Sequence, residues 1–219
     1  MMPEFSAQVL DSLRQPLESG EAVISRANRH VKYPSRFQLI AAANPCKCGG
    51  GPAEALCRKK PGCMAAYMGR ISGPFLDRID LFVDTPAVTA VDLAGPPPQE
   101  GTSEVSARVA IARNIQLERF KDIEQGRRQT NADASSADID RYCSLSSDGK
   151  DLIEQAAVKM NLSARAYHRV LKVARTIADL DRANDIERAH LAEALTYRFR
   201  QPGQIAEMSA KTSTSYMRS

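Results

Sequence analysis

One stretch, residues 37–80, constrains the fold more than any other part of the sequence. It begins with a continuous apolar run at residues 37–43, which is followed at once by Asn44 and Pro45. A short apolar run that stops at a proline predicts a fully buried strand, because proline cannot donate a ladder hydrogen bond. Asn44 is then expected at the carboxyl end of a strand, which is where ligands bind in open α/β sheets.

The same stretch carries a cluster of four cysteines within 18 residues, namely Cys46, Cys48, Cys57 and Cys63. Zinc prefers four soft ligands at tetrahedral corners, and the glycines at 49–51 let the backbone fold tightly beside a ligand pair. The spacing is not that of a standard zinc finger, so free thiols and an iron cluster are alternatives to Zn²⁺. An odd total of five cysteines, most of them clustered, favours metal ligation or free thiols over disulfides. Cys143 is isolated and is interpreted as a small apolar residue.

Composition indicates an ordinary water-soluble protein. The 219 residues are 43% hydrophobic with no tryptophan, which suits a helix-rich core in one large domain or two small ones. No segment is long and apolar enough to cross a bilayer, so no membrane partner is expected. The amino terminus lacks the basic and apolar regions of a signal peptide, and we therefore expect a cytoplasmic location.

The charge is unevenly distributed along the chain. Residues 22–76 contain nine basic residues and one acidic residue, a net charge of +8, whereas the whole chain carries +4. Such asymmetry predicts an electropositive surface suited to nucleic acid or to nucleotide phosphates. A solvated basic surface without a specific partner is the alternative.

A β-hairpin is predicted at residues 22–33, with short strands at 22–25 and 30–33. Its tip and second strand carry four basic side chains that we identify as candidate DNA contacts: Arg26, Arg29, His30 and Lys32. A basic tip would suit a phosphate backbone. The alternative is a solvated turn.

Helical patterns flank this region on both sides. Apolar residues recur at helical spacing over 3–19, with Ser6 as a plausible N-cap and Gly20 as the end. Residues 87–102 are rich in proline and glycine and predict a linker. A helical domain is expected at 103–200. Its first helix has a buried stripe that runs from Val105 to Phe120, and three more helices are expected at about 148–160, 163–180 and 186–199. A disordered tail is expected at 201–219.

Three blocks together carry a family resemblance: AAANPCKCGG at 41–50, RISGPFLDRIDL at 70–81 and SARAYHRVLKVARTIADL at 163–180. In this order they resemble the magnesium-chelatase-like AAA+ ATPases of the competence-protein M type, from Pro3 to about Phe199. The resemblance implies an α/β fold, in which residues 1–86 are an incomplete AAA+ (P-loop NTPase-like) core and residues 103–200 are an α-helical lid.

The resemblance also implies roles for individual residues. Asn44 would position the attacking water, Arg78 would be the arginine finger that reaches a neighbouring subunit, and Arg165 would be the sensor-2 arginine. A finger must be a planar, permanently charged donor, because charge builds on the phosphoryl oxygens. The alternatives are a surface salt bridge of Arg78 with Asp77 or Asp80, and a solvated basic face for Arg165. The basic hairpin would project into the pore of a ring and contact DNA.

Two motifs of the family are absent from the sequence. No GxxxxGK[ST] phosphate loop occurs, and the chain begins Met-Met-Pro-Glu-Phe, so that Met1 stands where the family pattern Asp-Glu-Leu-Pro-Glu-Phe has its catalytic glutamate. We therefore expect the carboxyl-terminal part of a longer ATPase, inactive by itself. ATP and Mg²⁺ would be cofactors of the intact protein. Without the strand of the phosphate loop, the strands at 37–43 and 81–83 would lack a neighbour, which predicts a gap in the sheet or poor solubility.

For the intact protein the resemblance implies ring self-association and ATP-driven DNA translocation or branch migration in recombination. The alternative function is a non-enzymatic, zinc-containing nucleic-acid-binding protein.

Overall fold

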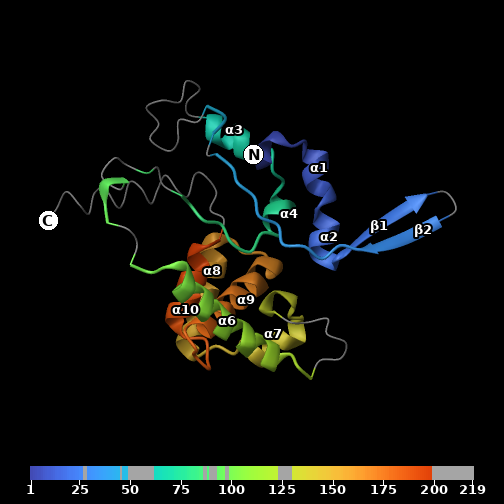
Figure 1. The fold of residues 1–219 in the computed structure, drawn as a ribbon. Coiled ribbons are helices and arrows are strands. Elements are labelled where there is room, and N and C mark those ends of the chain that lie inside the picture. The colour runs from blue at the N-terminus through green and yellow to red at the C-terminus, as the bar shows by residue number, and fades with distance from the viewer. Residues whose placement is uncertain are drawn as a thin grey trace. The chain divides into compact units, whose positions relative to one another are not determined.

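The computed structural model describes residues 1–26, 29–44, 46–48, 62–85, 88, 93–96, 99–122 and 130–198 (Figure 1). The chain divides into two compact units, of which Met1–Ile79 belong to the first and Asp80–Phe199 to the second. Helices dominate the described residues, and the strands in this part of the chain form one two-stranded sheet. The structure is thus a helix-rich mixed fold with a small β component.

The first unit begins with a short 3₁₀ helix, η1 (Met2–Glu4), and two short α-helices, α1 (Ala7–Ser12) and α2 (Arg14–Ser19). Ser6 caps α1 by accepting a hydrogen bond from the Val9 amide, as predicted. Gly20 ends α2 in the left-handed conformation at φ 68°, also as predicted. The expected single helix is instead interrupted at Leu13. Pro16 has no N–H, and the interruption places it in the first turn of α2, where no donor is needed.

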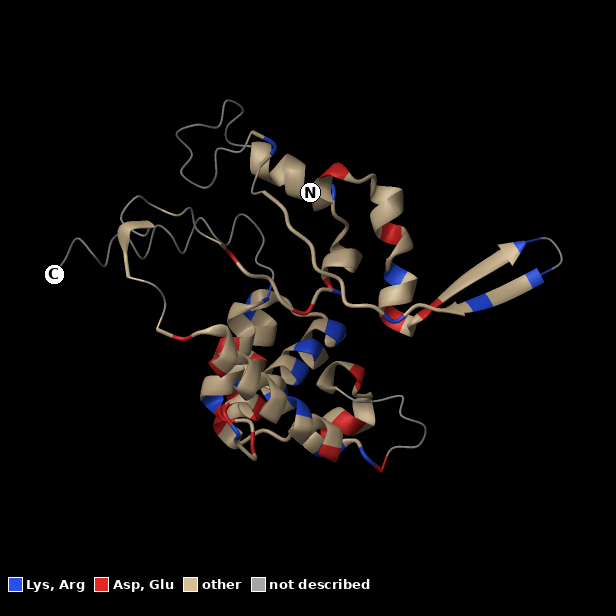
Figure 2. Ribbon diagram, in the orientation of Figure 1, with Lys and Arg blue, Asp and Glu red and all other residues tan. Residues whose placement is uncertain are grey.

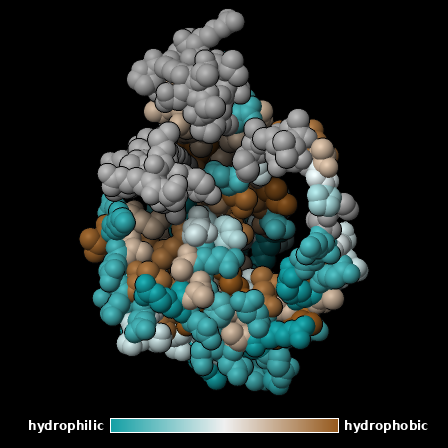
Figure 3. All heavy atoms as spheres, turned by 90° about the vertical axis from the view of Figure 1, so that its left-hand side faces the viewer, coloured by the Kyte–Doolittle hydropathy of each residue, from teal (hydrophilic) through white to brown (hydrophobic). Residues whose placement is uncertain are grey.

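The core of the first unit is small. Leu10, Ile71 and Phe75 are buried, and partly buried hydrophobic side chains surround them, including Leu13 and Leu17. The cluster draws on α1, α2 and α4 (Gly73–Leu76), on α3 (Cys63–Met68) through Met68, and on the turns that carry Leu13 and Ile71. The predicted apolar stripe is only partly buried, because Phe5 and Val9 are 56% and 48% exposed. Figure 3 shows brown hydrophobic side chains at the surface of the described residues.

The predicted hairpin is present, with β1 at Glu21–Arg26 and β2 at Arg29–Pro34. The strands are antiparallel, and their register runs from the pair Glu21 and Pro34 to the pair Arg26 and Arg29. Residues 27 and 28, which form the predicted turn, lie outside the described residues. The hairpin extends away from the helices of its own unit (Figure 1).

Two predicted strands, 37–43 and 81–83, are wrong, because both segments are irregular. Ile40 is 84% exposed and Val83 is 68% exposed. Their backbones make isolated hydrogen bonds, from the Met2 amide to the Ala42 oxygen at 2.9 Å and from the Phe82 amide to the Tyr197 oxygen at 2.8 Å. An apolar run becomes a buried strand only if neighbouring strands complete its ladder, and the described residues supply none here.

The second unit is helical. Its elements are α6 (Thr102–Arg119), the 3₁₀ helix η4 (Asn131–Asp133), α7 (Ser136–Tyr142), α8 (Ser147–Met160), α9 (Ala164–Leu180) and α10 (Arg188–Thr196). The four predicted helices correspond to α6, α8, α9 and α10, and Ser163 caps α9 as expected. Sequence analysis missed α7, although Ser135 and Asp138 form a capping box that the sequence displays.

Helix α9 is the centre of the second unit, because it packs against α6, η4, α7 and α10. Its buried face supplies much of one hydrophobic cluster: Ile139, Cys143, Ile153, Val170, Leu171, Ala174, Ile177, Ala178, Ile186, Leu191, Ala194 and Leu195. Cys143 is 7% exposed within this cluster, which confirms its interpretation as a small apolar residue. No described helix combines the length and apolar character needed to span a bilayer.

A charged network lies beside this cluster. The Asp179 carboxylate is completely buried and accepts hydrogen bonds from Arg119 at 2.5 and 2.7 Å, from Arg175 at 3.1 Å and from Asn131 at 2.8 Å. Arg175 also donates to the carbonyl oxygens of Asn184 at 2.8 Å and Ala183 at 2.6 Å. The network therefore joins α6, η4 and the carboxyl end of α9.

We expect Asp179→Asn to lower the free energy of unfolding of the helical unit by about 3–5 kcal/mol, because it leaves two buried guanidinium groups without an anion. Urea unfolding of the chain followed by far-ultraviolet circular dichroism measures the change. The matched control is Asp151→Asn on the exposed side of α8, which should change stability by less than about 0.5 kcal/mol. Equal effects of the two substitutions would contradict a structural role for the network.

Burial raises the pKa of the Cys143 thiol to about 11. Because the thiolate is the reactive form, we expect Cys143 to resist alkylation by iodoacetamide at pH 8 in the folded chain and to react once the chain is unfolded. Mass spectrometry of peptides alkylated with and without denaturant measures this difference. Rapid labelling of Cys143 in the folded chain would contradict its burial.

Candidate functional site

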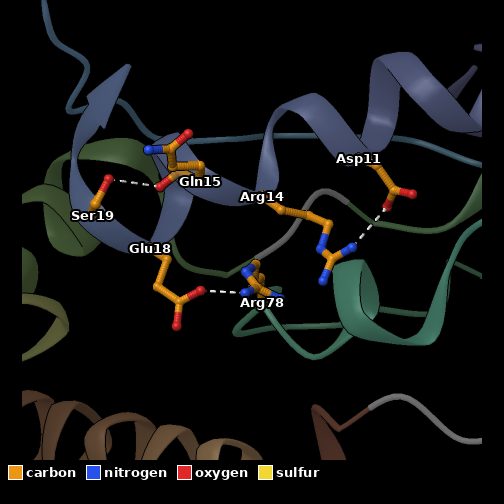
Figure 4. Close-up of a pocket in the computed structure, with 6 residues that line it drawn as sticks. All are labelled: Asp11, Arg14, Gln15, Glu18, Ser19 and Arg78. Carbon is orange, nitrogen blue, oxygen red and sulfur yellow. Dashed lines mark hydrogen bonds and ion pairs between the residues drawn. The ribbon is translucent and has the colours of Figure 1, made fainter. Parts of the chain in front are cut away.

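Arg78 follows α4 and is held in place by two contacts, of which Figure 4 shows the one with Glu18. Its Nη1 donates a hydrogen bond to the Pro74 carbonyl oxygen at 2.6 Å, and its Nη2 forms an ion pair with the Glu18 carboxylate of α2. The side chain is only 8% exposed. Its Nε is buried and has no hydrogen-bond partner among the described residues. The guanidinium is therefore positioned by the fold rather than extended into solvent.

The turn that carries Arg78 is built locally. Pro74 lies in the first turn of α4, where its missing N–H is tolerated, and the side chain of Phe75 is completely buried. Ser72, ahead of this turn, donates its hydroxyl hydrogen to Asp11 of α1 at 2.7 Å. Burial of Phe75 and the bond to α1 thus fix the backbone from which Arg78 projects.

Arg78 lines a pocket of about 390 Å³ within the first unit. The other lining residues are Asp11, Arg14, Gln15, Glu18 and Ser19 (Figure 4). Arg14 lies 3.7 Å from the Asp11 carboxylate, so each arginine of the pocket has an acidic partner. Two cations balanced by two anions do not fit a triphosphate, and the sequence has no phosphate loop. The described residues alone do not form an ATP site.

The ion pair of Arg78 differs from the salt bridge considered in the sequence analysis. Its partner is Glu18, 60 residues earlier in the chain. Asp80, one of the partners considered, forms an ion pair with Arg169 of α9 instead. Sequence analysis missed Glu18, whose only signal is its place on the polar side of a short amphipathic helix.

Asn44 is half-buried and follows the irregular segment 35–43. It is therefore not at the end of a strand, which corrects the local structure expected for it. The next residue, Pro45, lies outside the described residues. The role of Asn44 in positioning the attacking water stays a prediction.

Arg165 is exposed in the first turn of α9. Three basic residues of the predicted solvated stripe make defined contacts with other parts of the second unit. Arg169 pairs with Asp80, Lys172 donates to the Ala132 carbonyl oxygen at 2.9 Å, and Arg175 is buried beside Asp179. Burial lowers the pKa of Lys172. The stripe is thus largely structural, and the sensor role of Arg165 stays a prediction.

Three of the four clustered cysteines converge in the first unit. The sulfur atoms of Cys46, Cys48 and Cys63 all lie within 4.8 Å of one another, and those of Cys48 and Cys63 are 3.3 Å apart. Cys46 is buried, whereas Cys48 is exposed and Cys63 is half-buried. Cys57, the fourth predicted ligand, lies outside the described residues. Thiolates at this spacing are suited to binding a soft metal ion.

The hairpin presents its basic residues to solvent. Arg26, Arg29, His30 and Lys32 are all exposed, and Figure 2 shows basic residues at the distal ends of both strands. His30 shares a hydrogen bond with the Ser25 hydroxyl at 2.8 Å, and Lys32 pairs with Glu21 at 3.4 Å. Arg26 and Arg29 stand directly opposite each other in the register. The distal end of the hairpin is therefore its most cationic part.

Comparison with known proteins identifies the family. Residues 1–93 match the family model described as magnesium chelatase, subunit ChlI, and residues 99–198 match the one described as magnesium chelatase, subunit ChlI C-terminal. The two matches leave only residues 94–98 and 199–219 uncovered.

Individual relatives agree with these models. The chain is 46% identical over 198 residues to competence protein ComM of Haemophilus influenzae, covering 90% of this chain and 37% of that protein. It is 40% identical over 198 residues to the uncharacterized protein YifB of Escherichia coli, covering 90% and 38%. An uncharacterized protein of Mycobacterium tuberculosis is 36% identical over 196 residues, covering 89% and 38%. The chain spans less than two fifths of these relatives' length, and it belongs to the magnesium-chelatase-like family that includes competence protein ComM.

Proposed function

We propose that this chain forms part of an ATP-driven, ring-forming motor that acts on DNA during recombination, as its family resemblance implies. Within that motor it contributes a hairpin that contacts DNA and side chains that serve ATP sites. The exposed, cationic end of the β1–β2 hairpin is the observation that carries the proposal.

The register of the hairpin supports contact of its end with a polyanion. Arg26 and Arg29 are directly opposite, and like charges in that position repel each other and destabilise the strand pair. A phosphate between the two guanidinium groups would remove the repulsion and would form charge-assisted hydrogen bonds. Phosphate contacts of this kind are independent of base sequence, as a translocating motor requires.

Three further side chains are proposed to serve nucleotide. Asn44 orients water, Arg78 reaches the nucleotide of a neighbouring subunit and Arg165 senses nucleotide beside its own subunit. The phosphates themselves and Mg²⁺ are held by a phosphate loop outside these 219 residues. Arg78 is paired with Glu18 in this chain, so its use as a finger requires an exchange of Glu18 for phosphate oxygens. Both partners are anionic, which makes such an exchange chemically reasonable.

A second candidate function is a non-enzymatic nucleic-acid-binding protein that contains zinc. The convergence of Cys46, Cys48 and Cys63 favours it, because a metal would stabilise a scaffold for the hairpin. Both candidates bind nucleic acid. They differ in whether the protein, when joined to a phosphate loop, hydrolyses ATP.

The proposed function makes a prediction about DNA binding by the chain. Replacing Arg26 and Arg29 together by alanine should weaken binding to a fluorescent duplex by about tenfold or more at low salt. It should also reduce the slope of log K against log salt by about 1.8 units, because two phosphate contacts with the duplex are lost. Fluorescence anisotropy over a salt series measures both quantities.

A charge-matched control separates the hairpin from general electrostatic attraction. Lys150 and Lys159 are exposed on α8, so the double substitution Lys150→Ala and Lys159→Ala removes the same charge from another surface. This control should leave the salt slope nearly unchanged. Absence of binding by the unaltered chain, or equal losses in the two variants, would refute the role of the hairpin.

The proposed function also makes a prediction about ATP hydrolysis. We expect no magnesium-dependent release of phosphate from ATP by the chain alone, because its sequence contains no GxxxxGK[ST]. A colorimetric phosphate assay measures the rate against a protein-free blank. Turnover that disappears in an Arg78→Ala variant of the isolated chain would contradict this expectation.

The role of Arg78 is tested after a phosphate-loop segment from a family member is joined ahead of residue 1. Arg78→Ala should then lower the rate of ATP hydrolysis by about a thousandfold, the scale of a lost arginine finger. Arg14→Ala, which removes the other guanidinium of the same pocket, is the control and should have a small effect. An active fusion that is insensitive to Arg78→Ala would contradict the finger role and would leave Arg78 with the structural role of its ion pair with Glu18.

A further inference from the structure

The most concentrated set of metal-binding groups in the described residues is the thiol cluster of Cys46, Cys48 and Cys63. These residues come from two segments that are separated along the chain, an irregular one at 46–48 and the first turn of α3. Their sulfur atoms nevertheless meet within 4.8 Å. Two of the three are not freely exposed, since Cys46 is buried and Cys63 is half-buried. The fold therefore brings three soft ligands to one point.

We propose that Cys46, Cys48 and Cys63 bind a single structural Zn²⁺ as thiolates. Zinc–sulfur bonds of about 2.3 Å at tetrahedral angles place ligand sulfurs about 3.8 Å apart. The observed sulfur separations, from 3.3 Å up to the limit of 4.8 Å, span that value. Binding replaces thiol protons by the metal, so the protons are released to solvent. The three thiolates would supply three of the four tetrahedral positions, and water or a further side chain would supply the fourth.

The geometry also separates this site from the two other uses of clustered cysteines. A disulfide between Cys48 and Cys63 would leave the buried Cys46 without a role. An iron–sulfur cluster takes at most two cysteine thiolates on any one iron atom, so three thiolates that bind a cluster do not all converge on a single ion. Convergence of three sulfurs on one point favours a mononuclear site.

A cross-link at this site would stabilise the first unit. Helix α3 is attached to the amino terminus, because the Tyr67 hydroxyl donates to the Glu4 carboxylate at 2.8 Å and Arg70 donates to the Pro3 carbonyl oxygen at 3.3 Å. The Met2 amide in turn binds the Ala42 carbonyl oxygen, just ahead of the thiol cluster.

The segment that begins at residue 42 and α3 are thus both hydrogen-bonded to the amino terminus. A metal bound by the cysteines would add a direct cross-link between them. It would stabilise a region whose hydrophobic core is small. The inference holds whether or not the protein binds DNA or ATP, because it rests only on the thiols and their surroundings.

Metal content of the whole chain tests the proposal. The chain is purified with a non-thiol reductant, and its zinc and iron are measured by inductively coupled plasma mass spectrometry. We expect about one zinc per chain and no stoichiometric iron. Cys48→Ser should lose most of the zinc, whereas the matched control Cys143→Ala, which removes a buried thiol of the other unit, should retain it.

A second measurement does not depend on the variants folding. Cobalt added to the metal-stripped native chain should produce thiolate charge-transfer bands and the intense visible bands of a tetrahedral ion. A chelator should lower the unfolding temperature of the native chain, and added zinc should restore it. Metal-free native protein without cobalt bands, a Cys48–Cys63 disulfide in the native chain, or iron with labile sulfide would each overturn the proposal.

Discussion

The buried carboxylate of Asp179 is the interaction on which the helical unit depends. A carboxylate without solvent exposure is costly unless it is paired and fully hydrogen-bonded, and here two guanidinium groups and an amide satisfy it. Arg119 comes from the end of α6 and Arg175 from α9 itself, so one anion aligns two helices. The hydrophobic face of α9 can then pack against its neighbours in a single arrangement.

The candidate functional arginines are of two kinds, those neutralised by an acidic partner and those exposed to solvent. Arg78 and Arg169 are tied to Glu18 and Asp80, whereas Arg26 and Arg29 remain exposed beside each other on the hairpin. The hairpin is therefore ready to contact an anion, but Arg78 must change partners before it can do so. In the proposed function, the hairpin would contact DNA through side chains that are already exposed, and Arg78 would contact nucleotide through exchange of its ion pair.

Local features of the structure were predictable because their causes lie within a few residues. Ser6 and Ser163 cap helices through backbone amides three positions later, and Gly20 ends a helix because it adopts positive φ at little cost. The hairpin and four helices of the second unit follow from such signals and from apolar spacing. The strands predicted at 37–43 and 81–83 failed, because a strand is completed by partners elsewhere and not by its own sequence.

By itself the sequence determined the family, the positions of the hairpin and most helices, and the clustering of cysteines along the chain. Only the tertiary structure decided that Arg78 pairs with Glu18, that Arg175 and Arg119 share Asp179, and that three sulfurs meet at one point. The physical reason is the separation along the chain over which each kind of interaction acts. Capping and helical periodicity act over one or two turns, whereas ion pairs and metal ligands are joined by packing between residues that are tens of positions apart.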